Sequence, residues 1–264
     1  MRPSSSETPA GLRAEGGASG AALILAAGKG TRMKSDLPKV LHTLQGRPLL
    51  HWVIAAARAA GLTPQVIVVG HQAERVEASL AADGVGDLRF VLQAEQHGTG
   101  HAAQVARPAL ADLAGDLVVL AGDVPLIRPG TLSDLLAAHR ARQAAATVLT
   151  AELADPTGYG RILRDAAGDL LAIREHRDAS AAERAVREIN SGIYCFRLPA
   201  LRAALDALRP ENDQGEYYLT DTLAILRGQG ERIAAHRCVD PAEIAGINDR
   251  EQLATLEARL AGRD

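Results

Sequence analysis

Aromatic residues, cysteines and long apolar runs are scarce in this sequence. Aromatic side chains make up 3% of the 264 residues although 47% are hydrophobic, and the plentiful alanine is typical of helices packed on an aliphatic sheet. The two cysteines, Cys195 and Cys238, lie in strand-like apolar runs, which favours buried thiols in a reducing compartment over a metal site. No apolar run is long enough to span a bilayer, and no signal peptide is recognisable, so we expect a cytoplasmic protein.

Strong charge of either sign is also missing. The net charge is −3 at pH 7 and the basic residues are dispersed, so the sequence offers no surface for nucleic acid or for an anionic membrane. We therefore expect neither as a partner. A chain of this length and hydrophobicity can bury one sizeable α/β core or two small ones.

The chain divides into a leader, one domain and a terminal helix. Residues 1–20 are rich in Ser, Gly, Ala and Pro without periodicity, which predicts a disordered leader. The domain is expected over residues 21–248 and the helix over 249–264. Within the domain, apolar runs of strand length alternate with helical patterns as far as about residue 130. This alternation predicts an α/β, Rossmann-like fold with a mostly parallel central sheet and helices on both faces.

Two later runs depart from the alternation. Residues 160–165 and 168–175 are punctuated by Gly and Asp, which predicts a small antiparallel excursion. We expect Thr220 or Asp221 to cap one late helix and Asp249 to cap the last one. The expected strands are 23–26, 65–70, 88–93, 116–123, 147–153, 189–196 and 232–239, and the expected helices are 49–60, 73–82, 100–113, 131–143, 198–208, 221–228 and 249–260.

The stretch at 23–41, LILAAGKGTRMKSDLPKVL, is the one around which the rest of the chain is organised. An apolar strand ends at the Gly-Lys-Gly of 28–30, whose glycines let a ligand approach the backbone and leave N–H groups free to face phosphate oxygens. Cationic side chains follow at Arg32 and Lys39, and a helical pattern comes next. In open α/β sheets such a junction of strand, loop and helix is where ligands bind.

Two commoner glycine loops do not fit this stretch. A P-loop needs four residues between its first glycine and a Gly-Lys-Ser/Thr, and a dinucleotide fingerprint needs a small residue where this chain has Met33. An ordinary βα turn with solvated lysines is the remaining alternative. Arg32 and the pair Pro38–Lys39 favour phosphate binding, because Pro38 fixes the backbone just before a lysine that can point back at the loop.

The motifs AAGKGTRM and LPKVLH resemble the signature of the nucleotidyltransferases that make nucleotide-activated sugars and polyols. Together with GTGHA, EINSGIY and QGEYYLTD, they resemble more narrowly the N-acetylglucosamine-1-phosphate uridyltransferase family, over about Leu23 to Leu256. The resemblance implies Mg²⁺-dependent transfer of UMP from UTP to N-acetylglucosamine-1-phosphate, for the synthesis of cell-envelope precursors. One departure is Ala121, where some relatives carry a tyrosine.

The resemblance also implies a role for each matching residue. Arg32 and Lys39 would be catalytic, Asp123 and Asn248 would hold Mg²⁺, and Glu216 and Tyr217, in a mainly structural segment, are candidates for the pocket wall. The nucleotide would be bound by Leu25, Ala26, Ala27, Gly28, Lys39, Gln93, Gly98 and Thr99, and the sugar by Gly160, Glu175 and Asn190.

The residue patterns taken alone support part of this assignment. Gly98 and Thr99 begin a helix, and the free N–H groups of a helix N-terminus favour polar or anionic ligands. Asp123 ends a strand at the ligand edge of the sheet, where a carboxylate can hold a hard cation. Taken alone, it is better explained as a turn aspartate, and the second candidate ligand at Asn248 favours the cation site. His97 and His101 lack the glutamate between them that a zinc helix motif requires, so we expect His101 to be a packing residue.

Other functions remain open. A cytidylyl- or thymidylyltransferase acting on another sugar or polyol phosphate would share the first loop. A non-catalytic sugar-nucleotide sensor would keep the fold but is expected to lose a charged site residue, and Arg32, Lys39, Asp123 and Asn248 are all present. A dehydrogenase fits less well, because its fingerprint fails at Met33.

No internal repeat is found in the sequence. In the resembled two-domain enzymes, a left-handed β-helix of hexapeptide repeats follows the uridyltransferase and acetylates glucosamine-1-phosphate. Because no such repeat is present, we expect no acetyltransferase activity from this chain. The family's trimer contacts lie largely in that β-helix, so we expect a monomer or a weak oligomer.

Overall fold

The computed structural model describes residues 20–82, 84, 88–212 and 214–261. The expected leader therefore lies outside the described residues except for Gly20, which is the first residue of strand β1 (Gly20–Leu25). Within the described residues, no helix combines the length and the apolar character needed to cross a membrane.

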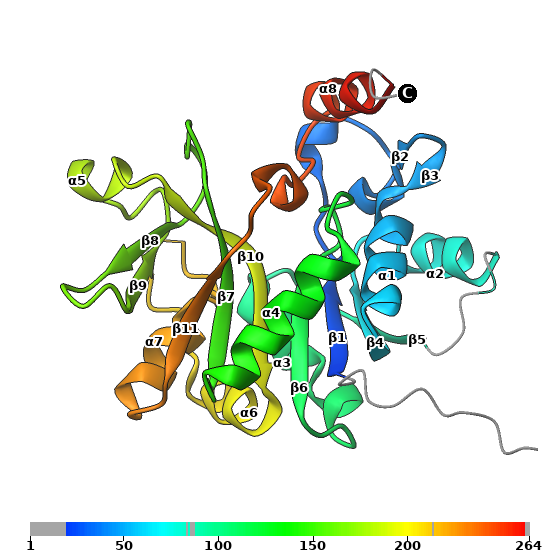
Figure 1. Ribbon diagram of the computed structural model, residues 1–264. Helices are drawn as coiled ribbons and strands as arrows, with labels where there is room; N and C mark the ends of the chain where they lie inside the picture. The colour runs from blue at the N-terminus through cyan, green and yellow to red at the C-terminus, as the bar shows by residue number, and fades with distance from the viewer. Residues whose placement is uncertain (1–19, 83, 85–87, 213, 262–264) are drawn as a thin grey trace, which may run out of the picture.

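A mostly parallel sheet forms the centre of the molecule (Figure 1). Its strands follow the order β11-β7-β10-β6-β1-β4-β5, and β1 pairs in parallel with both β4 and β6. The predicted α/β fold is confirmed. The bounds of the strands after β1 are β4 (Leu62–Val69), β5 (Leu88–Leu92), β6 (Asp116–Ala121), β7 (Ala146–Glu152), β10 (Glu188–Arg197) and β11 (Ile233–Arg237).

Strand β10 is the exception, because it runs antiparallel to both neighbours, β6 and β7. After β7 the chain makes the excursion of β8 (Arg161–Arg164) and β9 (Leu170–Arg174), which pair antiparallel as predicted. The chain then passes through the short helix α5 (Ala181–Arg184) and re-enters the sheet where it left, with Glu188 opposite Glu152. A strand that begins at the end of its predecessor must run in the opposite direction.

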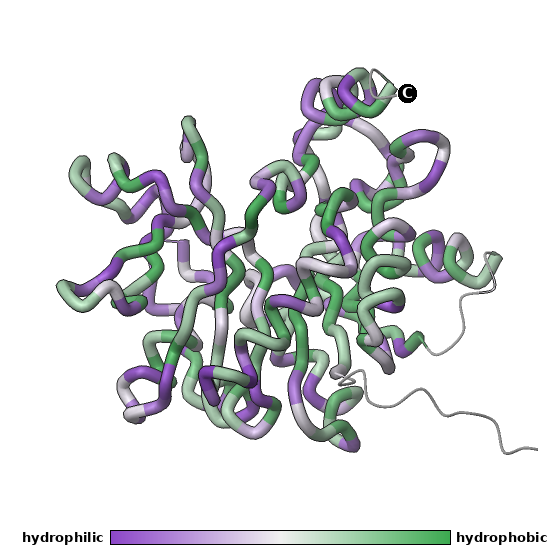
Figure 2. Tube along the Cα trace, in the orientation of Figure 1, coloured by the Kyte–Doolittle hydropathy of each residue, from purple (hydrophilic) through white to green (hydrophobic). Residues whose placement is uncertain are grey.

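Helices cover both faces of the sheet (Figure 1). Alternate residues of β1 divide between the two layers: Ala22 and Ile24 belong to one core cluster, and Ala21 and Leu23 to the other. Hydrophobic residues gather accordingly along the central strands in Figure 2. The first cluster contains side chains of α1 (Leu49–Ala59), α2 (Ala73–Ala82) and α4 (Pro129–Ala141), and the second contains side chains of α3 (Thr99–Val105), α6 (Leu198–Ala207) and α7 (Asp221–Gly228).

Two expectations about helix ends were wrong. The helix expected over 100–113 ends at Val105, and a separate 3-10 turn follows over Arg107–Leu110. Pro108 accounts for this break, since proline has no N–H and its ring clashes with the carbonyl four residues earlier. Helix α7 has no side-chain cap at Thr220, and Asp221 is its first helical residue.

The terminal helix α8 (Arg250–Ala261) packs on the small hairpin formed by β2 (Thr43–Leu44) and β3 (Arg47–Pro48). Leu256 joins a small apolar cluster there with Leu44 and Leu49. Figure 1 shows α8 beside this hairpin, at the end of the sheet where the strand β1 finishes. The chain's last helix is therefore placed next to its first loop.

Candidate active site

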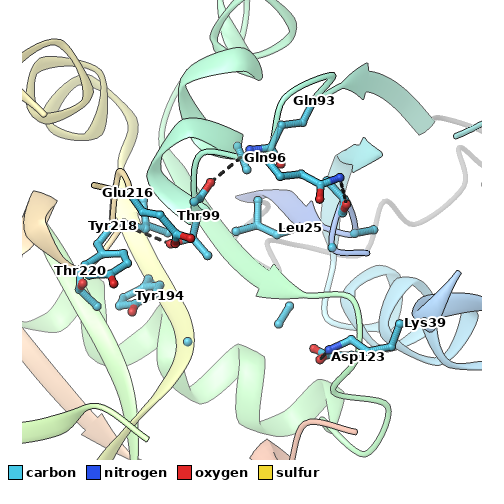
Figure 3. Close-up of a pocket in the computed structure, with 18 of the residues that line it drawn as sticks. Leu25, Lys39, Gln93, Gln96, Thr99, Asp123, Tyr194, Glu216, Tyr218 and Thr220 are labelled. Atoms are coloured by element: carbon cyan, nitrogen blue, oxygen red, sulfur yellow. Dashed lines mark hydrogen bonds and ion pairs between the residues drawn. The ribbon is translucent and has the colours of Figure 1, made fainter. Parts of the chain in front are cut away.

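A cavity of about 510 Å³ opens at the carboxyl ends of the central strands. This is the edge at which open α/β sheets bind ligands, and the volume suits a small molecule of drug size. In Figure 3, Lys39 and Asp123 face each other at one end of the cavity and Tyr194, Tyr218 and Thr220 lie at the other. The predicted site residues that line it are Leu25, Ala26, Ala27, Gly28, Lys39, Gln93, Gly98, Thr99, Asp123, Glu175 and Asn190.

Arg32, Lys39, Asp123 and Asn248 form one charged cluster. The Lys39 ammonium makes an ion pair with the Asp123 carboxylate and donates to Asn248 Oδ1 at 3.3 Å. Arg32 Nη2 donates to the same Asn248 oxygen at 2.9 Å. Arg32 and Asn248 do not line the cavity themselves, but these bonds place them directly beside it. Both expected Mg²⁺ ligands thus direct an oxygen at one cationic atom, Lys39 Nζ.

Metal ligands are few around this cluster. Among the residues that the structure describes, no three His, Cys, Asp or Glu side chains are grouped to hold an ion. His101 lies instead beside Gln93, with its Nδ1 3.1 Å from the Gln93 amide nitrogen, which fits the expected packing role. A cation held by Asp123 and Asn248 would take its other ligands from phosphate and water, as Mg²⁺ commonly does.

The turn before α3 forms a second wall of the cavity. Gln93 is buried, and its amide nitrogen donates to the carbonyl of Gly98 at 3.2 Å. Gly98 has φ +101°, and a Cβ at this position would lie 2.5 Å from the Tyr217 carbonyl oxygen. Only glycine fits this backbone and this close approach. The turn therefore depends on a segment more than a hundred residues later in the chain.

That later segment, residues 216–220, forms hydrogen bonds with the turn before α3 and with the first residues of α3. Gly100 N donates to the Tyr217 carbonyl at 2.7 Å, and Leu219 N donates to Thr99 Oγ1 at 3.1 Å. The Tyr217 ring lies near the His101 ring, with 6.2 Å between the centroids. Glu216 lines the cavity as expected, whereas Tyr217 does not, so the expectation for Tyr217 was wrong; Tyr218 lines it instead.

The three residues expected to bind sugar also meet. Asn190 N donates to the Gly160 carbonyl at 2.9 Å, and a Cβ on Gly160 would lie 3.3 Å from Glu175 Oε1. Gly160 itself does not line the cavity. Burial, reinforced by the charges of Asp178 and Asp221, raises the pKa of Glu175. A donor from a ligand hydroxyl would favour the charged carboxylate that this environment disfavours.

Several wall residues were missed from sequence. Gln96 donates to the Ala27 carbonyl at 2.9 Å, and Tyr194 and Thr220 line the cavity. Tyr194 lies in the same motif as Asn190, four residues further along β10, and Thr220 lies in the motif QGEYYLTD. The motifs marked these segments but not which of their side chains line the cavity. Ala121, the noted departure, is also in the wall.

The N-terminal turn of α8 supports the charged cluster from outside. Arg250 donates to the carbonyls of Met33 and Lys34, at 2.9 and 3.3 Å, and so holds the turn that carries Arg32. Asn248 N donates to Gln252 Oε1 at 2.7 Å. Asp249 Oδ1 accepts from Gln252 N at 2.8 Å, which confirms the expected cap.

The family follows from a direct comparison of the sequence. Residues 22–190, most of the chain, match the family described as MobA-like NTP transferase domain. The chain belongs to this family. The predicted nucleotidyltransferase class is thereby confirmed. The match covers the glycine loop, the turn before α3 and the Asn190 strand.

Individual proteins similar to this chain belong to a narrower group than the family. The chain is 55% identical over 243 residues to the Bifunctional protein GlmU of Pelobacter propionicus, which covers 92% of this chain and 52% of that protein. It is 52% identical to the GlmU of Pelotomaculum thermopropionicum, with the same coverage, and 50% identical over 242 residues to that of Brevibacillus brevis. The chain thus spans about half the length of these curated relatives.

A solved structure agrees with the fold. A crystal structure of UDP-glucose pyrophosphorylase complexed with UDP-glucose superposes with a TM-score of 0.75, over 93% of this chain and 99% of that chain. The two sequences are 18% identical, so the likeness establishes the common fold.

The close approach at Gly98 gives a first test. Gly98→Ala places a methyl group against the Tyr217 carbonyl and strains a positive φ, so we expect it to lower the free energy of unfolding by about 2–3 kcal/mol and to weaken the binding of a nucleoside triphosphate severalfold. Urea denaturation and calorimetric titration with the nucleotide measure both. Gly115→Ala is the control: its φ is +81° with nothing within 4 Å, so only the strain of about 1 kcal/mol is expected. Equal effects of the two variants on stability and nucleotide affinity would contradict the role of Gly98.

The contact of Arg250 with the loop gives a second test. Arg250→Ala removes two hydrogen bonds at an exposed side chain, so we expect the thermal midpoint to change little but turnover to fall about tenfold, because the turn that carries Arg32 is less precisely positioned. Arg250→Lys should restore part of the rate. Arg259→Ala, an exposed arginine near the other end of α8, is the control and should match the wild type in steady-state pyrophosphate release. Wild-type turnover in Arg250→Ala would reject the positioning role.

Proposed function

We propose that the protein transfers UMP from UTP to N-acetylglucosamine-1-phosphate, forming UDP-N-acetylglucosamine and pyrophosphate with Mg²⁺ as cofactor. The observation that carries this proposal is the presence of three different groups of residues around one cavity. These are the turn at 93–99 for the base, the charged cluster around Lys39 for the phosphates, and Glu175 with Asn190 for the sugar. The 55% sequence identity with a GlmU protein, over 92% of this chain, supports the same function.

The reaction needs positioning and charge stabilisation more than proton transfer. The phosphate oxygen of the sugar phosphate, already an anion near neutral pH, attacks the α-phosphorus of UTP in line. The new O–P bond forms as the bond from that phosphorus to the β-phosphate oxygen breaks, and pyrophosphate leaves with the electron pair. A site that holds both substrates and stabilises the equatorial oxygens suffices for such a transfer.

Arg32 and Lys39 are placed to provide that stabilisation. Lys39 lines the cavity, and Arg32 reaches the same cluster through Asn248. The glycine loop lies against Lys39, since a Cβ on Gly30 would be 2.5 Å from that of Lys39, and backbone N–H groups of such a loop suit phosphate oxygens. Preorganised donors of this kind stabilise charge that develops in the transition state, which is why their removal affects turnover more than binding.

Asp123 and Asn248 fit a Mg²⁺ ion, because an oxygen of each is already directed at the ammonium of Lys39. A bound Mg²⁺ would neutralise phosphate charge and orient the reacting oxygens. Lys39 would then be free to turn its ammonium from Asp123 to a phosphate oxygen. In the absence of ligands, the Asp123 carboxylate keeps the Lys39 ammonium at the cavity.

The two cations give a third test. Arg32→Ala and Lys39→Ala should each lower turnover by about 10²–10³-fold, the usual loss of one transition-state donor, while the affinity for UTP changes only severalfold. Single-turnover kinetics and calorimetric titration separate the two quantities. Lys34→Ala is the control and should remain active, because Lys34 lies in the same loop but its side chain forms no hydrogen bond or ion pair with the cluster among the described residues. Unchanged turnover in either cation variant would reject its catalytic role.

The whole proposal is tested by pyrophosphate release from the purified chain. We expect release with UTP, Mg²⁺ and N-acetylglucosamine-1-phosphate, and much less when CTP or dTTP replaces UTP or glucose-1-phosphate replaces the acetamido sugar. Preference for another nucleotide would identify a different nucleotidyltransferase. Silence with every pair, despite measurable UTP binding, would identify a non-catalytic sensor of sugar nucleotides.

A further inference from the structure

A bulge in strand β10 shapes the sugar side of the cavity. Asn190 pairs with Thr150 and Tyr194 with Val148, so four steps along β10 match two steps along β7. Gly192, inside the bulge, has φ +78°. Bulges of this kind redirect side chains next to active sites. The result is that Asn190 and Tyr194 both line the cavity and contact each other.

Ser191 fixes the bulge. Its hydroxyl donates to the Leu149 carbonyl at 2.6 Å and accepts from Ile193 N at 3.1 Å. Both bonds are buried. Ser191 therefore anchors the bulge to the neighbouring strand by one bond and closes it across Gly192 by the other.

The Asn190 amide is held at both ends. Its Nδ2 donates to the Tyr194 hydroxyl at 2.7 Å, and its Oδ1 accepts from Gly192 N at 3.0 Å. A flipped amide would place its nitrogen against the Gly192 N–H, donor against donor, so this orientation is the only one that satisfies both neighbours. One N–H and one oxygen lone pair of the Asn190 amide then remain for a ligand. They can pair with the C=O and the N–H of an amide group in that ligand.

Tyr194 is suited to holding that amide under all working conditions. The side chain is 3% exposed, and burial raises the pKa of its phenol well above the usual range, so the hydroxyl stays neutral. Among the described residues it donates to no protein acceptor. Its ring packs on Phe196, 5.7 Å between centroids, so a phenylalanine would keep the packing and lose only the hydroxyl.

We propose that Tyr194 is a positioning residue that sets the preference for an acetamido sugar, because it orients the Asn190 amide toward the amide of the substrate. The inference rests on the proposed function. A sugar with a hydroxyl in place of the acetamido group cannot complete the amide pair, and a site built for hydrogen bonds discriminates against a substrate that leaves them unmade. Tyr194 acts through Asn190 and need not touch the reacting phosphates.

The test compares Tyr194→Phe with the wild type on N-acetylglucosamine-1-phosphate and glucose-1-phosphate at saturating UTP. We expect KM for the acetamido sugar to rise about tenfold, the size of one lost hydrogen bond, with kcat and KM for UTP unchanged. The kcat/KM for glucose-1-phosphate should be unchanged, so the selectivity ratio falls about tenfold. Thermal melting checks that the variant is folded.

Asn190→Ala completes a double-mutant cycle. If Tyr194 works through Asn190, the double variant loses no more selectivity than Asn190→Ala alone. Additive losses, unchanged selectivity in Tyr194→Phe, or an equal loss with both sugars would each overturn the inference while leaving the proposed function intact. A wild-type protein that transfers UMP to neither sugar would overturn the proposed function and this inference together.

Discussion

The ion pair between Lys39 and Asp123 is the contact on which the site depends. It joins the first loop to the end of β6, 84 positions apart in the chain, and through Asn248 it also joins the segment before α8. Both side chains are largely buried at the rim of the cavity, so each charge needs a partner of opposite charge. Ligands bring such partners, since a phosphate can take the lysine and a cation can take the carboxylate. The same contact therefore organises the cavity and leaves it ready to bind.

The other walls rely on similar long-range contacts. Residues 216–220 bond to the turn before α3, and the bulge of β10 is anchored to β7. None of these wall segments is held by its own local structure alone. Parallel strands make this arrangement natural, because their carboxyl ends, and the loops that follow, collect at one edge of the sheet.

Much of the fold could be predicted because its signals are local. The bounds of α2 and α7 match the expected helices, since apolar spacing and flanking residues mark them. The direction of β10 could not be read in this way. The alternation of apolar residues in β10 is the same for a parallel and an antiparallel strand. The strand runs antiparallel to β7 because the chain enters it beside the end of β7. The break at Pro108 was visible in the sequence and was missed.

The sequence by itself determined which segments form the central strands, the glycines that allow close approach, and the chemical types of the site residues, because each depends on a few neighbouring positions. Only the tertiary structure decided which of them meet. Arg32 and Asn248 lie 216 positions apart yet share a hydrogen bond, and no local pattern marks the contact of Arg250 with the Met33 carbonyl. Such pairs arise when the sheet brings distant loops to one edge, and their geometry belongs to the whole fold.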